Sequence, residues 1–150
     1  MNSIMVSMKA ETVNDIASGK KRAEVMKKRS SLLELPLKVY IYEAKGRLQN
    51  KPNLGYTSYK HNGRGAVVGE FVCYKIKAVD LFNIDEATKA ALRMKTREIT
   101  ERLNGETGYI YFFSDVKMYD QPKPIEQFGK KSPPHWWCYV EEREENENHD

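Results

Sequence analysis

Ser18-Gly19-Lys20-Lys21-Arg22-Ala23-Glu24-Val25 joins a helical pattern to a strand pattern near the start of the chain. Residues 11–18 carry apolar side chains at helical spacing, and Gly19 is a typical residue just past the end of a helix. In the run 20–29, apolar residues alternate with charged ones, as in a strand with one face in water. That run holds six basic residues and one acid, Glu24. We expect a short helix followed by a basic strand.

The remaining patterns predict more strands than helices. Strand-like runs occur at 4–8, 38–43, 66–77, 108–117 and 136–140, and a helical run at 85–104 ends before Gly105. Residues 44–65 are rich in turn formers and predict a long loop. This order predicts an α+β fold, in which a mixed β-barrel of about five to seven strands is flanked by two or three helices.

The net charge of +4 is distributed unevenly over the 150 residues. Residues 141–150 carry six acids and one Arg, a net charge of −5, which leaves +9 for residues 1–140. A body this basic suggests an anionic partner such as a phosphate backbone. We expect one domain at 1–140 and a disordered acidic tail at 141–150.

Several common classes of protein are disfavoured. No apolar run approaches the roughly 20 residues of a membrane span, and no secretory signal is recognisable, so we expect a cytoplasmic protein without a membrane partner. Cys73 and Cys138 fit two thiols in a reducing cytosol, with a disulfide or a catalytic thiol as the alternative. The spacing of His61, His135 and His149 predicts no metal site, and no nucleotide-cofactor motif is present.

Two acids stand out from their surroundings. Glu24, alone among cations, can hold a lysine in place or share acid–base work with it, or it can form a surface ion pair. Glu70 lies in an otherwise apolar strand, where an acid is either exposed at an edge or placed for function.

The aromatic residues Tyr40 and Tyr42 can stack on bases or belong to the core.

The ordered set of these motifs resembles the ASCH domains of the PUA-like superfamily, with small bacterial and phage-borne members the most similar. Residues 18–25 resemble the family element S-G-x-K-x-x-E-F/V, and residues 7–9 resemble S-I/L-K-P, with Ala10 in place of Pro. Further similar segments complete the pattern over residues 3–141: 38–42, 67–73, 108–109, 122–129 and 133–140.

This resemblance implies a PUA-like barrel whose G-x-K-x-x-E strand lines a cleft for RNA or a modified base. Some members are hydrolases of N4-acetylcytidine or RNA. In the branch that deacetylates N4-acetylcytidine, a Lys at the position that matches Lys21 and a Thr at the position that matches Glu24 take part in the reaction. Here Glu24 replaces that Thr, and Met26 replaces a usual Arg. Either Lys27 with a slipped register or Arg29 takes over, or the ligand differs.

The first hypothesis is therefore an RNA- or nucleotide-binding module whose binding weakens with salt. Its predicted contact residues are Lys9, Lys21, Lys27, Arg29, Tyr40, Tyr42 and Trp136. The alternative is a metal-independent hydrolase of RNA or a modified nucleoside, with acid–base work shared by Lys21, Glu24 and Glu70. A second alternative is a protein-binding adaptor that uses the tail or the loop.

Overall fold

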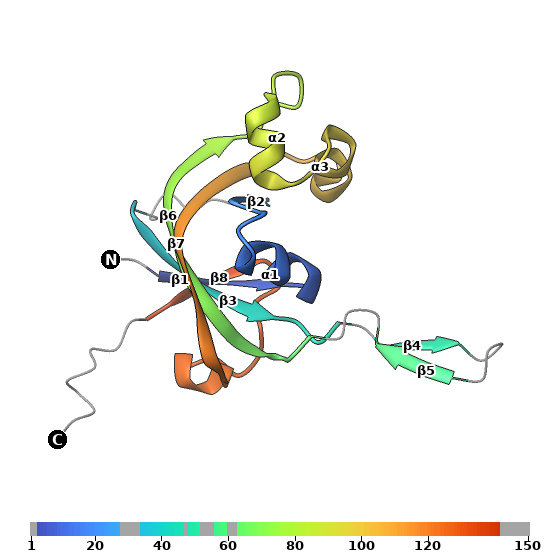
Figure 1. Ribbon diagram of the computed structural model, residues 1–150, viewed down its shortest axis with the longest axis vertical. Coiled ribbons are helices and arrows are strands. Elements are labelled where there is room, and N and C mark those ends of the chain that lie inside the picture. Colours follow the sequence, from blue (N-terminus) through green and yellow to red (C-terminus); the bar gives the residue numbers. More distant parts are fainter. Residues whose placement is uncertain (1–2, 28–33, 47, 52–55, 60–62, 142–150) are drawn as a thin grey trace.

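The computed structural model describes residues 3–27, 34–46, 48–51, 56–59 and 63–141. A six-stranded sheet in the order β2-β7-β6-β3-β1-β8 curls into a half-barrel (Figure 1). Only the β1–β3 pair is parallel among these described strands. The strands are β1 Ser3–Met8, β2 Ala23–Met26, β3 Leu37–Glu43, β6 Ala66–Ala78, β7 Tyr109–Lys123 and β8 Trp137–Val140. The predicted α+β class and mixed sheet are confirmed.

Helices cover both faces of this sheet. The α-helices are α1 Ala10–Ala17, α2 Glu86–Leu92 and α3 Thr96–Leu103, and a short 3-10 helix, η2, spans Ile125–Phe128. Val13 and Ile16 of α1 pack with alternate residues of β1 and β3, such as Val39, in the main core. We call this side of the sheet the α1 face. Ile125 packs on the opposite side, which we call the η2 face.

A second core cluster fixes α2 and α3 over the edge strand β2. Leu92, Ile99 and Leu103 from these helices pack with Ala23 and Val25 of β2. Burying a large aliphatic side chain contributes about 1.5–3 kcal/mol to folding. All four residues of β2 are buried, so the predicted basic strand with one wet face is wrong. The basic residues of that run flank the strand, and residues 28–29 lie outside the described part of the chain.

The helix predicted at 85–104 is two helices in the structure. The backbone of Arg93 is left-handed, with φ 56°, which ends α2. Lys95 then begins α3, and its N–H is capped by the Glu98 carboxylate in a capping box. A left-handed Arg is uncommon, because the Cβ atom of an L-residue is crowded by the backbone in this conformation. Glycine or asparagine usually occupies such a helix end. The break leaves the final carbonyls of α2 open to other partners.

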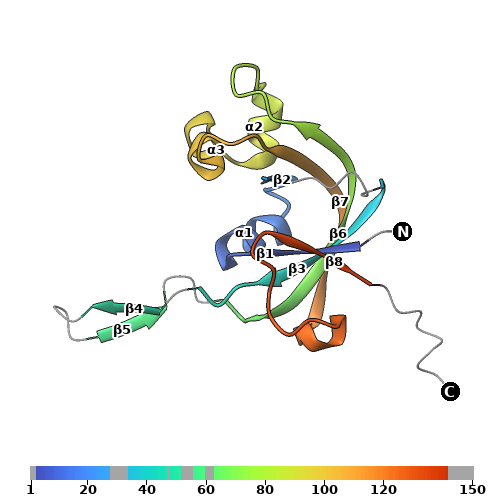
Figure 2. The same ribbon diagram turned by 180° about the vertical axis from the view of Figure 1, so that it is seen from behind.

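The loop predicted at 44–65 contains a β-hairpin. Strands β4 Leu48–Lys51 and β5 Tyr56–Tyr59 pair antiparallel, with Leu48 opposite Tyr59. Both views show the hairpin projecting from the body of the molecule (Figures 1 and 2). At its base, the buried carboxylate of Glu43 accepts hydrogen bonds from the backbone N–H of Arg64 at 2.7 Å and from its Nε at 3.0 Å.

Other expectations concern the thiols and the tail. Cys73 is buried and Cys138 is half-buried, and both are free thiols. Burial raises the pKa of Cys138 above its usual value. No helix among the described residues is long and apolar enough to cross a membrane. Residues 142–150 of the predicted acidic tail lie outside the described residues.

Candidate functional site

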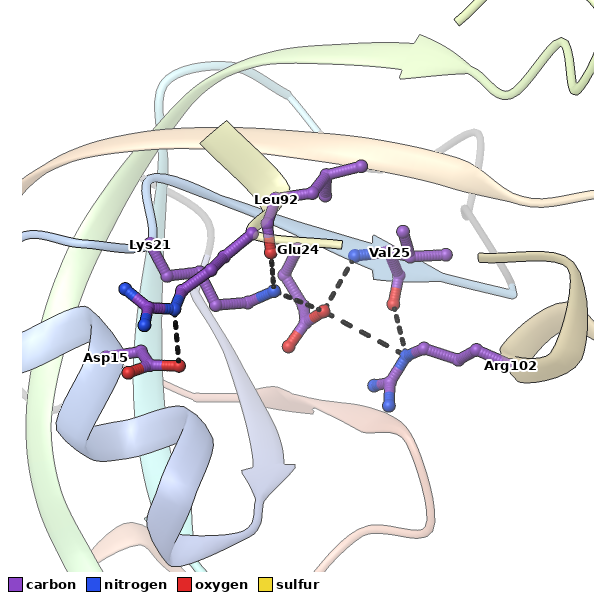
Figure 3. A network of polar contacts seen from close by, with 7 residues as sticks. Asp15, Lys21, Glu24, Val25, Leu92 and Arg102 are labelled. Atoms are coloured by element: carbon purple, nitrogen blue, oxygen red, sulfur yellow. Dashed lines mark hydrogen bonds and ion pairs between the residues drawn. The ribbon is translucent and has the colours of Figure 1, made fainter. Parts of the chain in front are cut away.

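Lys21 and Glu24 form a buried ion pair at the start of β2. Their side chains are only 6 % and 5 % exposed, and Lys21 Nζ lies 3.4 Å from Glu24 Oε1 (Figure 3). Lys21 Nζ also donates to the Leu92 carbonyl at 2.6 Å, and Glu24 Oε1 accepts from the Val25 N–H at 2.9 Å. Each charge thus has a further polar partner, as buried charges require.

The local fold explains why these two residues are buried. The chain turns sharply after α1 at Gly19, whose φ is +80°, and then crosses the end of α2. There the Arg22 N–H donates to the Ala91 carbonyl at 2.8 Å, while Lys21 bonds the Leu92 carbonyl. These are the carbonyls that the break at Arg93 leaves open. A cation is favourable at a helix C-terminus, so Lys21 also has a structural role.

Burial makes Lys21 chemically unusual. Loss of hydration lowers the pKa of its ammonium below the usual 10.5, and the nearby Glu24 carboxylate only partly opposes that effect. A lysine that releases its proton more easily can act in acid–base chemistry. The same shift would arise in a purely structural pair.

Arg102 of α3 brings a second cation to Glu24. Its Nε lies 3.9 Å from Glu24 Oε1 and donates to the Val25 carbonyl at 3.3 Å (Figure 3). The side chain is 33 % exposed. The sequence analysis missed this residue. It lies three positions after Ile99, so it shares the inward side of α3 at its boundary with solvent.

Trp136 places an aromatic ring beside this guanidinium. The Arg102 Cζ atom lies 4.9 Å from the ring centroid, and Lys27 Nζ lies 5.3 Å from it. Both distances are within the range of cation–π contacts. The segment carrying the ring is held to β1, because the Ser7 N–H donates to the Trp136 carbonyl and Ser7 Oγ donates to the Pro134 carbonyl at 2.7 Å.

Two adjoining cavities open beside this cluster, with volumes of about 310 Å³ and 200 Å³. We call them together the cleft. The larger one lies at the lower end of the range of about 300–1,000 Å³ that is common for small-molecule sites. Both cavities share Lys9, Thr12, Glu24 and Arg102, so these residues mark their junction.

The lining of the cleft is balanced in charge rather than basic. Four Lys or Arg side chains and four Asp or Glu side chains line it. The lining residues of these two signs are Lys9, Lys21, Arg93, Arg102, Glu11, Asp15, Glu24 and Glu98. The expected basic character of the cleft is therefore not found among its described residues.

The structure places three of the predicted site residues elsewhere. Glu70 and Tyr40 are direct partners across β3 and β6 and lie on the η2 face, where Tyr40 packs against Phe128 with ring centroids 4.8 Å apart. Tyr42 is buried in the core of that face, and burial raises its pKa. Of the predicted stacking residues, Trp136 is the one that lines the cleft.

The strand register also answers the question raised by Met26. Glu24 pairs with Tyr111 and Met26 with Tyr109, without a shift, and Met26 is buried in the main core. Lys27 therefore does not take the strand position of Met26 through a slipped register. Arg29 lies outside the described residues. The guanidinium observed near Glu24 comes from α3 instead.

The part of the chain that the structure describes contains no group of three or more His, Cys, Asp or Glu side chains that could hold a metal ion. Opposite charges of the cleft lie in pairs: Lys21 with Glu24, Arg93 Nε with Asp15 at 3.5 Å, and Lys9 Nζ with Glu11 at 3.9 Å.

No family model and no curated protein sequence matches the chain. Among solved structures, the ASCH protein of Zymomonas mobilis is similar, with a TM-score of 0.69 and 16 % identity over 97 % of this chain and 90 % of that chain. One mutant form of the same protein gives a TM-score of 0.70 at 16 % identity, over 93 % of this chain and 89 % of that chain. A second mutant form gives a TM-score of 0.64 at 16 % identity, over 95 % of this chain and 92 % of that chain. The resemblance found in the sequence is thus confirmed at the level of the fold: the chain has the α+β fold of an ASCH domain.

Proposed function

We propose that the cleft binds one nucleotide unit of an RNA. The observation that carries this proposal is the position of Arg102, whose guanidinium lies between the Glu24 carboxylate and the Trp136 ring where the two cavities meet. RNA-binding proteins stack unpaired bases on aromatic rings and on guanidinium planes, and they bond base edges with polar groups. The cleft has all three kinds of group within a few ångströms.

Each residue then has a defined task. Trp136 and the guanidinium of Arg102 offer stacking surfaces for a base. Arg102 and Lys9 can neutralise a phosphate, and Glu24 can accept hydrogen bonds from the edge of a base. Because the lining is balanced in charge, stacking and hydrogen bonding carry much of the affinity for a single nucleotide. We therefore expect that affinity to depend only weakly on salt.

The test is binding of fluorescently labelled mononucleotides and short RNAs at low and moderate salt. Base stacking contributes about 1–3 kcal/mol per base, so Trp136→Ala should weaken binding between about 5-fold and 150-fold. Arg102→Gln should weaken it by a similar amount. Matched controls are Tyr74→Ala, a half-exposed aromatic residue of β6, and Arg97→Gln, an Arg of α3 that is 88 % exposed.

The controls should bind as the wild type does. Equal loss in the controls and the cleft variants would overturn the assignment of the site. Absence of binding by the wild type to every RNA and nucleotide would overturn the proposed function and leave the adaptor hypothesis.

A second candidate function is supported by the burial of Lys21. Its lowered pKa and its contact with Glu24 beside a cavity fit a hydrolase in which the Lys21 amine and the Glu24 carboxylate exchange protons with water and the leaving group. Glu70 has no place in this version, because it lies on the η2 face.

Turnover is followed in the same mixtures by chromatography of the RNA and of N-acylated nucleosides, with a chelator present. Product that forms with the wild type and disappears with Lys21→Met, while Trp136→Ala changes mainly KM, would establish the hydrolase. If the substrate binds but stays intact over a long incubation, the hydrolase is overturned and the protein is a binding module.

A further inference from the structure

The two cavities of the cleft differ in charge. Lys9, Glu24 and Arg102 line both of them, so the described lining of the larger cavity has two cations and one acid. That acid, Glu24, is already paired with Lys21. The smaller cavity has four cations and four acids, and three of these acids line it alone: Glu11, Asp15 and Glu98. An anionic group of a ligand is therefore better placed in the larger cavity than in the smaller one.

His135 lines the larger cavity, and neither the fold nor the contacts proposed so far explain it. The residue is exposed and directly precedes Trp136. Its imidazole makes no hydrogen bond and no ion pair with the described residues. An imidazole has one N–H donor when it is neutral and two when it is protonated. His135 therefore brings to the cavity a donor that no described group of the protein uses.

The backbone around His135 is held in place although the side chain is exposed. Ser7 of β1 bonds to the residues on both sides of it. Ser7 Oγ donates to the Pro134 carbonyl at 2.7 Å, and the Ser7 N–H donates to the Trp136 carbonyl at 3.4 Å. Pro133 and Pro134 precede the histidine, and each ring fixes one backbone angle. A contact residue on an ordered backbone loses less conformational freedom when a ligand binds.

Lys9, the residue before α1, lines the same cavity. Its ammonium lies 3.9 Å from the Glu11 carboxylate, but the two side chains are 50 % and 66 % exposed. Exposed ion pairs of this kind contribute little to stability, so the Lys9 ammonium can turn to an anion at small cost. Thr12 adds a hydroxyl group to the lining. The cavity thus has an ammonium, a hydroxyl and an imidazole as donors beside the Trp136 ring.

A phosphate group fits these donors. Its oxygens accept hydrogen bonds from all three kinds of group, and bonds between charged partners are shorter and stronger than neutral ones. Because His135 and Lys9 are exposed, a phosphate beside them keeps part of its hydration, and its desolvation costs less than in a buried site. We infer that His135 and Lys9 form a phosphate subsite in the larger cavity, so that the cleft distinguishes a nucleotide from a nucleoside. This inference rests on the proposed function of the cleft.

The contact with His135 makes binding at this subsite depend on pH. Histidine is the side chain that ordinarily changes its charge between about pH 5 and about pH 8. The other charged groups described around the cavity are Lys9 beside α1, Glu24 of β2, Arg102 of α3, and Lys27, which lies over the Trp136 ring. Side chains of these types ordinarily keep their charge over that range. A bound phosphate favours the protonated imidazole, so the added affinity is present at low pH and is lost as the pH rises.

The test uses uridine and uridine 5′-methyl phosphate as probes, in calorimetric titrations from about pH 5.5 to about pH 8. The methyl ester keeps one negative charge over this range, whereas a phosphomonoester takes up a proton near pH 6. His135→Gln removes the charge of the imidazole, and His135→Arg keeps a positive charge at every pH. Lys131→Gln, which changes an exposed lysine outside the described lining of the cleft, is the matched control.

The wild-type affinity for the methyl ester should fall roughly tenfold from the low to the high end of this range, because one charge-assisted contact is lost. Affinity for uridine should not change with pH. His135→Gln should bind the ester at every pH as weakly as the wild type does at high pH, and His135→Arg should bind it tightly throughout. Lys9→Gln should weaken binding of the ester at every pH but retain the pH dependence. Lys131→Gln should match the wild type.

The outcomes separate this subsite from the proposed function. A His135→Gln protein with the pH dependence of the wild type would overturn the assignment of His135. Equal wild-type affinity for uridine and for the ester at low pH would overturn the phosphate subsite, while base binding by Trp136 and Arg102 stands. A wild type that binds neither probe would overturn the cleft proposal itself. Thermal denaturation of each variant before titration shows that it is folded.

Discussion

Glu24 and Glu70 have similar neighbours in the sequence but lie on opposite faces of the sheet, and they differ in burial. Each lies in a strand between apolar neighbours, and each holds a lysine, with Lys21 Nζ at 3.4 Å from Glu24 and Lys38 Nζ at 3.6 Å from Glu70. The first pair is buried on the α1 face, beside two cavities. The second lies on the η2 face, where the Glu70 side chain is 21 % exposed and accepts a hydrogen bond from the Tyr119 hydroxyl at 2.8 Å.

The difference shows that burial and surroundings, and not the pairing itself, separate a candidate functional pair from a structural one. Water can replace much of what either partner loses when the Glu70 pair is broken. In the buried pair, Lys21 donates to a helix-end carbonyl, and Glu24 accepts from a backbone N–H and lies beside the guanidinium of Arg102 at the cleft. The pair at Glu24 should therefore be much more sensitive to substitution than the pair at Glu70.

The largest expected effect is on stability. Glu24→Gln removes the negative charge and leaves the Lys21 ammonium buried with only uncharged acceptors, which costs about 3 kcal/mol or more in the free energy of unfolding. Glu70→Gln should cost about 1 kcal/mol or less, because its partner Lys38 remains partly in water. Urea denaturation of both variants measures this contrast. Equal losses would show that the two faces do not differ in the way proposed here.

Binding gives the next contrast. Arg102→Gln should weaken nucleotide binding about tenfold, since a bond to a charged group contributes about 1.5–3 kcal/mol and water recovers a part of it. Lys38→Gln, which removes the cation of the η2-face pair, should leave the affinity unchanged. Fluorescence titration with a labelled mononucleotide compares them. A loss of affinity in Lys38→Gln that matches the loss in Arg102→Gln would contradict the placement of the ligand on the α1 face.

Part of this contrast was accessible from the sequence. The motif at 18–25 located the Lys21–Glu24 pair, and alternation within 38–43 separated Val39 and Ile41 from the two tyrosines. Which of these sides meets the cleft depends on where α1 and η2 dock, and alternation cannot tell the two sides apart. Tyr40 and Glu70 share a face only through the register of β3 with β6, which short strands do not encode locally.

The helical region was predicted less well, for a different reason. Arg93 ends α2 in a left-handed conformation that sequence rules assign to Gly or Asn, so the pattern at 85–104 contained no signal for the break. Without the break, Leu92 has no open carbonyl for Lys21, and Arg102 falls at an arbitrary place along a longer helix. The sequence analysis missed Arg102 because it did not predict the break at Arg93 that positions α3 beside the site.

A smaller, pH-dependent effect should distinguish Lys21. Burial lowers its folded-state pKa below the value of about 10.5 expected in the unfolded chain. Between these two values the unfolded state binds more protons, so stability rises with pH there. The stability of the wild type relative to Lys21→Met should therefore increase as the pH approaches about 10.5 from below. Tyr42 and Tyr119 titrate in both proteins and cancel in this difference. Parallel stability curves from neutral pH upward would show that Lys21 keeps its ordinary pKa.

The smallest effect belongs to the η2 face. Tyr119→Phe removes the hydroxyl that donates to Glu70 Oε1, and the ring keeps its contact with Lys123, whose Nζ lies 4.3 Å from the ring centroid. Burial of the tyrosine, together with the Glu70 carboxylate, raises the pKa of Tyr119 above its usual value, so the hydroxyl stays protonated and donates over the whole neutral range. We expect a loss of about 0.5–1.5 kcal/mol in urea denaturation, the range for one hydrogen bond. Nucleotide affinity should not change, because Tyr119 and the cleft lie on opposite faces of the sheet. A weakened affinity in Tyr119→Phe at unchanged stability would mean instead that the η2 face takes part in binding, and the two glutamates would then be parts of one site.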